Sequence, residues 1–351
     1  MKSLRTFLML FSCFAASSFA VETTVVLFVV DGVQGEAMKV AAANGAGHFR
    51  FLIDQGVWVE EAYSPTPAPR MTLPDGSLPW GTASAPNVAM HTGTHVFESP
   101  QIDDIFLSAR RAGIKSVFAG GAENYRVFTT PDFTYAGRLS DAEVVQHGID
   151  HFRKDGVRLI RLHLQEIRNS WTGPEDQLDP HGKYQRHLQE ADALLGKLIA
   201  TLKQAGVWDV SYVIAGGDHG MGNSKQSNHP PSVASSWKPF MVFYGPGLKR
   251  GATIPYAETP DMAIMANYFL KLKPLAGYTD PAVNVEPKGT TGTFLSNILE
   301  GSPRELKHPR FIRRYLENNG WAPPDAYGDY RRAMLSLIKD STPAEPHRTV
   351  P

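Results

Sequence analysis

The sequence DVSYVIAGGDHGMG, residues 209–222, combines a short apolar strand with two side chains that bind metals. Its first half is rich in β-branched residues, which is typical of a strand buried inside a parallel sheet. The glycines end the strand, and Asp218 and His219 then leave its carboxyl end, where open α/β sheets bind their ligands. A carboxylate beside an imidazole suits zinc or a similar divalent ion. Because Asp and His beside glycine are also ordinary turn residues, this stretch alone leaves both interpretations open.

A second stretch, VVLFVVDG at residues 25–32, is again an apolar strand that ends on a carboxylate, Asp31, followed by glycine. Parallel strands present their carboxyl ends at one edge of a sheet. Two buried strands would therefore deliver Asp31, Asp218 and His219 to the same place. Together the two stretches predict a metal site at that edge.

Segments with strand and helix character alternate along the rest of the chain. One helix start carries a capping box, formed by Ser140 and Glu143. The alternation predicts an α/β fold with a largely parallel central sheet and helices on both faces. The further strands that we expect are residues 56–59, 115–119, 157–164 and 239–244, and the helices are residues 34–44, 48–55, 88–95, 102–112, 140–154 and 181–204.

Residues 1–20 have the pattern of a signal peptide: a basic start, an apolar run at 7–11 and small residues before Ala20. The apolar run is far too short to span a bilayer, so we expect a periplasmic or secreted protein without a transmembrane helix. The only cysteine, Cys13, lies in this segment, and cleavage would leave a mature chain without a thiol. A lipid anchor on Cys13 is disfavoured because the bulky Phe11 fits a lipoprotein cleavage site poorly.

The chain after residue 20 divides into three expected parts: a main domain, a helical appendage and a tail. We expect one α/β domain over residues 21–301, a basic, helical appendage over 302–340, and a disordered, proline-rich end over 341–351. The 35 basic and 35 acidic residues cancel, so the composition does not point to a nucleic-acid-binding surface. The sequence does not determine the oligomeric state.

Three motifs along the 351 residues resemble the alkaline phosphatase superfamily, most closely its type I phosphodiesterase/nucleotide pyrophosphatase branch. They are VVDG at 29–32, SAPN at 84–87 with Thr92-Gly93 shortly after, and GDHGM at 217–221. The resemblance implies an alkaline-phosphatase-like fold and a hydrolase in which divalent ions, usually two zinc ions, bind phosphate and activate a Ser or Thr.

The resemblance also implies roles for individual residues. Asp31, Asp218 and His219 resemble the ligands of the metal that activates the nucleophile. Ser84 resembles the nucleophile and Asn87 the amide that holds a phosphoryl oxygen. Thr72, in the sequence TLPD, offers a rival match for the nucleophile. Ser84 has the better context, since a helix-like segment follows it and would present free N–H groups to an anion, although Ser84 would also suit a simple helix cap.

The second metal site departs from the family pattern. An Asp and a His four residues later are expected after a strand, but the segment HLQEIRNSWT at 163–172 puts Arg168 and Thr172 there, and only His229 resembles the remaining ligand. Three explanations compete. In a one-metal enzyme, Arg168 supplies the missing positive charge. In a rearranged site, other residues bind the second ion, the candidates being Asp179, His181 and Glu166. In a degenerate homologue, turnover is lost.

We therefore expect an exported, metal-dependent hydrolase of small-molecule phosphate esters, most simply a phosphodiesterase that forms a phosphoryl-enzyme on Ser84. The alternatives are a phosphomonoesterase or sulfatase-like hydrolase and, from a different class, a non-catalytic metal-binding homologue. A sulfatase is disfavoured because Val88 stands where the motif for formylglycine formation requires arginine.

Overall fold

The computed structural model describes residues 22–65, 85–96, 103–170, 172–222, 229–275, 290–303, 305–321, 323 and 327–341. Both proposed nucleophiles, Ser84 and Thr72, lie outside these residues, as do residues 1–20 and 342–351.

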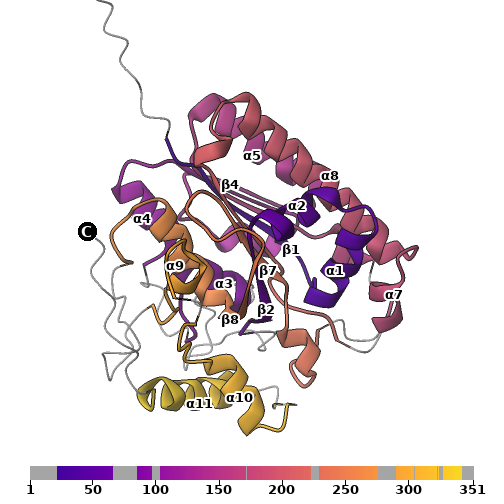
Figure 1. The fold of residues 1–351 in the computed structure, drawn as a ribbon, viewed down its shortest axis with the longest axis vertical. Coiled ribbons are helices and arrows are strands. Elements are labelled where there is room, and N and C mark those ends of the chain that lie inside the picture. Colours follow the sequence, from indigo (N-terminus) through magenta and orange to yellow (C-terminus); the bar gives the residue numbers. More distant parts are fainter. Residues whose placement is uncertain are drawn as a thin grey trace, which may run out of the picture.

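An eight-stranded sheet forms the centre of the molecule, in the order β4-β3-β5-β1-β6-β7-β2-β8 (Figure 1). Every pairing is parallel except those of β7, which runs antiparallel to both of its neighbours. The predicted α/β fold with a largely parallel sheet is therefore confirmed. The strands are β1 (Val25–Val30), β2 (Val57–Tyr63), β3 (Ser116–Gly120), β4 (Phe133–Ala136), β5 (Leu159–Leu164), β6 (Tyr212–Gly216), β7 (Met241–Tyr244) and β8 (Ala252–Glu258).

Strand β1 lies at the centre of this sheet, between β5 and β6. All six of its residues are fully buried, as its unbroken apolar composition predicts. The register places Val29 beside His163 of β5 and beside Gly216 of β6. The carboxyl ends of three strands therefore meet at one point of the sheet edge.

Helices cover both faces of the sheet, and each face has its own apolar core. One face is covered by α1 (Gly35–Ala43), α2 (Gly47–Gln55), α5 (Asp141–Asp155) and α8 (Lys183–Gln204), with the short α6 (Glu166–Asn169) and α7 (Pro174–Leu178) nearby. The other face is covered by α3 (Ala85–Thr92), α4 (Ile105–Arg111) and α9 (Thr259–Phe269), together with α10 (Phe311–Asn318) and α11 (Tyr327–Lys339). Within the described ranges, four short 3-10 helices and less regular segments connect these elements.

Local signals in the sequence fix where two of these helices begin. The predicted capping box is present at α5, where the Ser140 hydroxyl accepts from the Glu143 amide and the Glu143 carboxylate accepts from the Ser140 amide. Helix α9, which the sequence did not predict, begins with an acidic version of the same motif: the Glu258 amide donates to the Asp261 carboxylate at 2.7 Å.

The carboxyl-terminal helices α10 and α11 pack onto the same core as α3 and α9, below the sheet in Figure 1. The backbone N–H of Ile312, in α10, donates to the Glu258 carboxylate at 2.8 Å. The hydroxyl of Tyr330, in α11, donates to the carbonyl oxygen of His95 at 3.0 Å. These contacts tie both helices to the residues around α3 and α9. The division of the chain at residue 301 stays a prediction.

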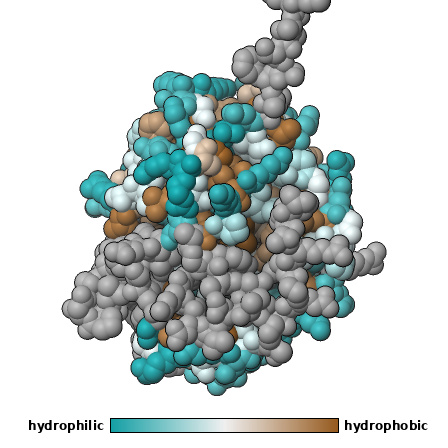
Figure 2. All heavy atoms as spheres, turned by 90° about the vertical axis from the view of Figure 1, so that its left-hand side faces the viewer, coloured by the Kyte–Doolittle hydropathy of each residue, from teal (hydrophilic) through white to brown (hydrophobic). Residues whose placement is uncertain are grey.

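The surface mixes hydrophilic and hydrophobic residues. Figure 2 shows hydrophobic side chains bordered by hydrophilic ones on the upper part of the face that carries α4 and α9. Among the described residues, Phe51 and Leu178 are the large hydrophobic side chains that are strongly exposed. No helix in the described ranges has the length and apolar character needed to cross a membrane.

Candidate metal centre

Asp31, Asp218 and His219 meet at the carboxyl ends of β1 and β6, as the two strand motifs predict. Their ligand atoms all lie within 4.8 Å of one another, and all three side chains are buried. His219 Nε2 is 3.6 Å from Asp31 Oδ1 and 3.6 Å from Asp218 Oδ2. Two carboxylates and an imidazole facing one point form a donor set that suits zinc.

Hydrogen bonds leave free lone pairs on two of these ligands. His219 Nδ1 lies 2.7 Å from the carbonyl oxygen of Gly220, which can only accept, so Nδ1 carries the proton and Nε2 presents its lone pair to the cluster. Asp31 Oδ1 is buried and has no hydrogen-bond partner in the described structure. A buried carboxylate oxygen without a donor is costly unless a cation compensates it. Both observations fit a bound divalent ion.

Glycines allow the two ligand-bearing turns to approach each other closely. Gly32, directly after Asp31, has φ +70°, and a Cβ there would lie 2.6 Å from Met221 Sδ. Its N–H donates to Asp218 Oδ1 at 3.1 Å, and the His219 N–H donates to the same oxygen at 3.0 Å. The turn after β1 therefore fixes the position of the Asp218 carboxylate, which follows β6 in the chain.

Arg168 lies on the solvent side of Asp31, in the short helix after β5. Its Nη1 is 3.8 Å from Asp31 Oδ2, and its Nη2 is 3.0 Å from His229 Nε2. The His229 ring also packs against the His219 ring, with centroids 4.2 Å apart. The structure thus brings four sequence-predicted site residues into one group: Asp31, Arg168, His219 and His229.

The charges of this group shift its pKa values. The Asp31 carboxylate raises the pKa of the Arg168 guanidinium. Burial alone would raise the pKa of Asp31, but Arg168 and the neighbouring histidines hold it below its ordinary value. Burial, together with the neighbouring His219 ring and the Arg168 guanidinium, lowers the pKa of His229 to about 3. His229 is therefore neutral at physiological pH and accepts the hydrogen bond from Arg168.

Asn87, in α3, reaches the cluster from the covering helix. Its Nδ2 donates to Asp218 Oδ2 at 3.1 Å, and its Oδ1 accepts from Arg161 Nη2 at 2.5 Å. The amide is buried, and these two partners fix which way it points. Ser84 immediately precedes α3 in the chain, so the order of the motif places the proposed nucleophile next to this helix start.

The sequence reasoning missed three polar residues of β5 and its end: Arg161, His163 and Gln165. His163 Nε2 lies 3.3 Å from Asp31 Oδ2 and 3.9 Å from Asp218 Oδ2, and Gln165 Nε2 donates to Asp31 Oδ2 at 3.3 Å. Burial of Arg161 lowers its pKa to about 10, so the side chain stays charged at neutral pH. The available signal was their spacing, since polar residues at alternate positions of an otherwise apolar strand share one face.

The alternative ligands for a second ion lie in other contacts. The Glu166 carboxylate accepts from the Asp141 N–H at 3.2 Å, and Asp179 accepts from the N–H of His181 at 3.0 Å. Thr172 donates to Asp176 at 3.0 Å. Within the described ranges, the one group of three acidic or histidine residues with metal-site spacing is the one already given. Among the described residues, Glu166, Asp179 and His181 are thus not part of a second cluster with metal-site spacing.

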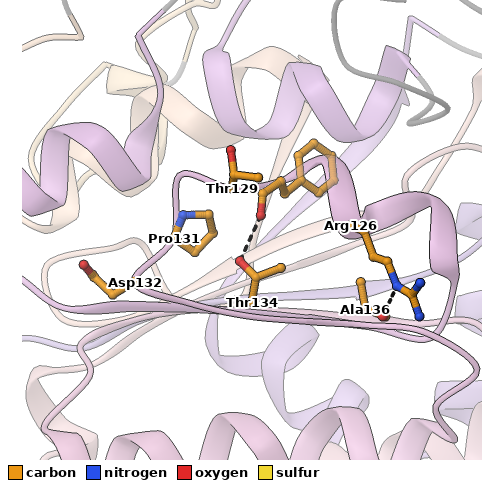
Figure 3. Close-up of a pocket in the computed structure, with 7 residues that line it drawn as sticks. Arg126, Thr129, Pro131, Asp132, Thr134 and Ala136 are labelled. Atoms are coloured by element: carbon orange, nitrogen blue, oxygen red, sulfur yellow. Dashed lines mark hydrogen bonds between the residues drawn. The ribbon is translucent and has the colours of Figure 1, made fainter.

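A surface pocket lies along the edge strand β4, away from this centre (Figure 3). Arg126 Nε donates to the carbonyl oxygen of Ala136 at 3.2 Å, and Thr134 donates to that of Phe128 at 2.9 Å. None of the residues that line this pocket belongs to the metal cluster. Both acceptors belong to the pocket's own walls, and the pocket adds nothing to the candidate site.

Comparison with known proteins gives one family and a common fold. The family model for sulfatases matches residues 110–262, which include β5, Asp218 and His219. No curated protein matches the chain. Among solved structures, murine ectonucleotide pyrophosphatase/phosphodiesterase 5 is similar, with a TM-score of 0.55 and 15% identity over 79% of this chain and 100% of that one. A second structure of the murine protein, inactive and in complex with AMP, gives a TM-score of 0.56 and 15% identity over 80% of this chain and 100% of that one.

A bacterial protein shares the fold as well. The phosphonate monoester hydrolase of Agrobacterium radiobacter gives a TM-score of 0.57 and 14% identity, over 80% of this chain and 77% of that one. At such identities the likeness shows a shared fold, and the chemistry of this chain has to be argued from its own residues.

Proposed function

We propose that this chain, whose fold and sulfatase-model match resemble the alkaline phosphatase superfamily, is a metal-dependent hydrolase of small-molecule phosphate esters, acting on diesters. The observation that carries this proposal is the buried group of Asp31, Asp218 and His219, whose free lone pairs face one point. A divalent ion bound there, most simply zinc, would offset the charge of the phosphate and lower the pKa of the attacking hydroxyl.

Ser84 is the proposed nucleophile. Its Oγ would form a bond to phosphorus as the bond to the leaving oxygen breaks, and water would then cleave the phosphoserine and restore the hydroxyl. Asn87, three residues later and buried at the cluster, would hold a phosphoryl oxygen through its Nδ2. Thr72 remains the alternative nucleophile.

Arg168 is the proposed substitute for a second metal ion. Its guanidinium lies between the Asp31 carboxylate and His229, which are the two groups near this position that could otherwise help to bind an ion. A guanidinium can hold two phosphoryl oxygens at once, so it would neutralise the substrate while orienting it. This arrangement supports a one-metal mechanism.

A sulfatase-like activity is the second candidate, because the sulfatase family model covers the segment from β3 into α9. Sulfatase-like sites also combine metal with cationic side chains, and Arg161 and Arg168 both lie near the cluster. Val88 still speaks against the formylglycine nucleophile of such enzymes.

The deciding experiment measures bound metal per chain by elemental analysis of purified protein, together with hydrolysis of a bis(aryl) phosphate, an aryl phosphate and an aryl sulfate before and after chelation. We expect about one ion per chain and chelator-sensitive turnover fastest on the diester. Preference for the sulfate would establish the second candidate. A bound ion without turnover on any ester would overturn the enzyme assignment and favour a non-catalytic homologue.

We also propose that residues 1–20 are removed during export and that the mature protein is periplasmic or secreted. The basic, apolar and small-residue pattern of this segment supports the proposal. Amino-terminal sequencing of protein recovered from the periplasm or medium should give Val21 as the first residue. An intact amino terminus on cytoplasmic protein would contradict it.

A further inference from the structure

Arg161 is a fully buried cation without an acidic partner. None of the ion pairs in the described structure involves it, and its Nε has no hydrogen-bond partner. Its guanidinium lies 5.1 Å from the ring centroid of Phe118 and 5.9 Å from that of Phe128. Burying a charge without an ion-pair partner carries a desolvation cost. Ion pairing within the described structure therefore does not explain the residue.

The guanidinium instead contacts helix α3 at three positions on one side. Nη2 donates to Asn87 Oδ1 at 2.5 Å and lies 3.4 Å from Met90 Sδ, while Nη1 donates to His91 Nε2 at 2.6 Å. The short distances to Asn87 and His91 are those of charge-assisted hydrogen bonds. Because arginine can only donate, it forces the oxygen of the Asn87 amide toward itself. The Asn87 Nδ2 is thereby left facing Asp218 Oδ2, 3.1 Å away.

The same guanidinium also determines the tautomer of His163. Its Nη2 lies 3.5 Å from His163 Nδ1. A proton on Nδ1 would face a positive donor, so the ring keeps its lone pair there and carries its proton on Nε2. On that side the ring faces Asp31 Oδ2 at 3.3 Å, which as a carboxylate oxygen can only accept, and the Tyr125 hydroxyl at 2.9 Å. His163 is therefore a donor to the Asp31 carboxylate, and its Nε2 is not available as a fourth metal ligand.

We propose that Arg161 is a positioning residue that sets both metal-binding carboxylates, Asp218 through Asn87 and Asp31 through His163. Each carboxylate then has one oxygen held by a donor that Arg161 has oriented. For Asp31 this leaves Oδ1 directed at His219. The inference rests on the proposed metal site, but it concerns the affinity for metal and the state of His163, neither of which requires turnover.

The test compares wild type with Arg161→Met, which keeps an unbranched side chain among the same aromatic rings. Zinc affinity is measured by competition with a chromophoric chelator, and folding by thermal unfolding of the metal-free protein. We expect zinc affinity to fall by about 10-fold to 100-fold, the usual effect of removing a group that orients a ligand. The unfolding temperature should fall because the buried acceptors of Asn87 and His91 lose their donor, but the metal-free variant should still unfold in one cooperative transition above the temperature of the binding measurement.

The matched control is Met90→Leu, which removes the sulfur contact to Arg161 and touches neither carboxylate. Zinc affinity should change by less than about twofold. A loss of zinc affinity in Met90→Leu equal to that in Arg161→Met would assign the effect to packing of α3 and overturn the inference. Unchanged zinc affinity in Arg161→Met would overturn it as well.

A second measurement needs no substitution at Arg161. In metal-free protein labelled with ¹⁵N-histidine, His163 should show the Nε2–H tautomer, with the signal assigned by its loss in His163→Gln. An Nδ1–H tautomer in wild type would overturn the inference. Loss of zinc affinity in Arg161→Met, in a protein that hydrolyses no ester, would uphold the inference while the proposed function fails.

Discussion

The guanidinium of Arg168 and the carboxylate of Asp31 face each other at the edge of the metal cluster, with Nη1 3.8 Å from Oδ2. The pair is asymmetric, because Asp31 is buried whereas the Arg168 side chain is 32% exposed. The cation can therefore reach a substrate from the position in which it balances the ligand. In the proposed one-metal mechanism, the positive charge at this position is a property of the chain itself.

Arg168→Ala should lower turnover of a diester by about 100-fold or more, the usual scale for removing a group that stabilises charge in the transition state. Bound metal per chain should stay unchanged, because Arg168 is not a ligand. Turnover and elemental analysis on the same preparation check both parts.

The matched variant Arg168→Lys keeps the positive charge but not the two-pronged geometry, so it should recover only part of the activity. Wild-type turnover in Arg168→Ala would contradict the one-metal mechanism.

Zinc should stabilise the folded protein. An ion that binds only the native state raises the free energy of unfolding by about 2.7 kcal/mol at one hundred times its Kd. Thermal unfolding with zinc and with a chelator measures the difference. In Asp31→Asn, which removes a ligand charge at the cluster, most of this difference should disappear.

Gly32→Ala should disturb the metal cluster. A second glycine of the same chain, Gly113, provides a matched control. Gly32 and Gly113 have almost the same backbone angle, φ +70° and +74°, but a Cβ on Gly113 meets nothing within 4 Å, whereas one on Gly32 lies 2.6 Å from Met221 Sδ. Gly113→Ala should cost about 1–2 kcal/mol from the backbone alone.

Gly32→Ala should cost roughly 1–3 kcal/mol more than its control because the core around Met221 is overpacked. It should also weaken zinc binding, since Gly32 N–H holds Asp218. Chemical unfolding and chelator competition on both variants decide the matter, and equal losses of stability would show that the close approach is unimportant.

Two buried carboxylates, Glu258 and Asp261, lie beneath the carboxyl-terminal helices, and each is paired with a histidine. The free energy of unfolding should therefore decrease on an acidic limb at low pH and on an alkaline limb at high pH. Burial would lower the pKa of His308, but its ion pair with Asp261 at 2.7 Å outweighs this and raises the pKa above 6.5. That contribution is complete below 6.5 and is lost as pH rises through the raised value. Burial would raise the pKa of Glu258, but His95 and other donors hold it below 4.5.

The Glu258 contribution is therefore present above pH 4.5 and is lost as pH falls through the lowered value. Urea unfolding of metal-free protein across pH should show a maximum between the two limbs. His308→Gln should flatten the alkaline limb and leave the acidic one. An unchanged alkaline limb in that variant would remove His308 from the explanation.

Much of the sheet and the core of the metal cluster could be predicted from the sequence because buried strands have an unbroken apolar composition. The motifs after β1 and β6 correctly brought Asp31, Asp218 and His219 together. Helix α9 was missed because it is buried on most sides and so lacks an amphipathic pattern. The antiparallel direction of β7 was also beyond prediction, since composition does not specify strand direction.

The residues around the ligands were harder to predict for a different reason. Arg161 and His163 act through Asn87 and Asp31, and such partners depend on which segments pack together. Their alternation along β5 was visible, but only the sheet order reveals that the strand is adjacent to β1.

The hydrogen bond from Tyr330 to the carbonyl of His95 links the last helix of the chain to the segment that follows α3. During synthesis the amino-terminal parts of a protein fold first, at the pace of translation. The helix that carries Asn87 can be braced by α11 only after residues 327–339 have been synthesised. The segment after α3 thus depends on a helix 235 residues further along the chain, and a chain cut before α11 would retain its metal-binding residues without that support.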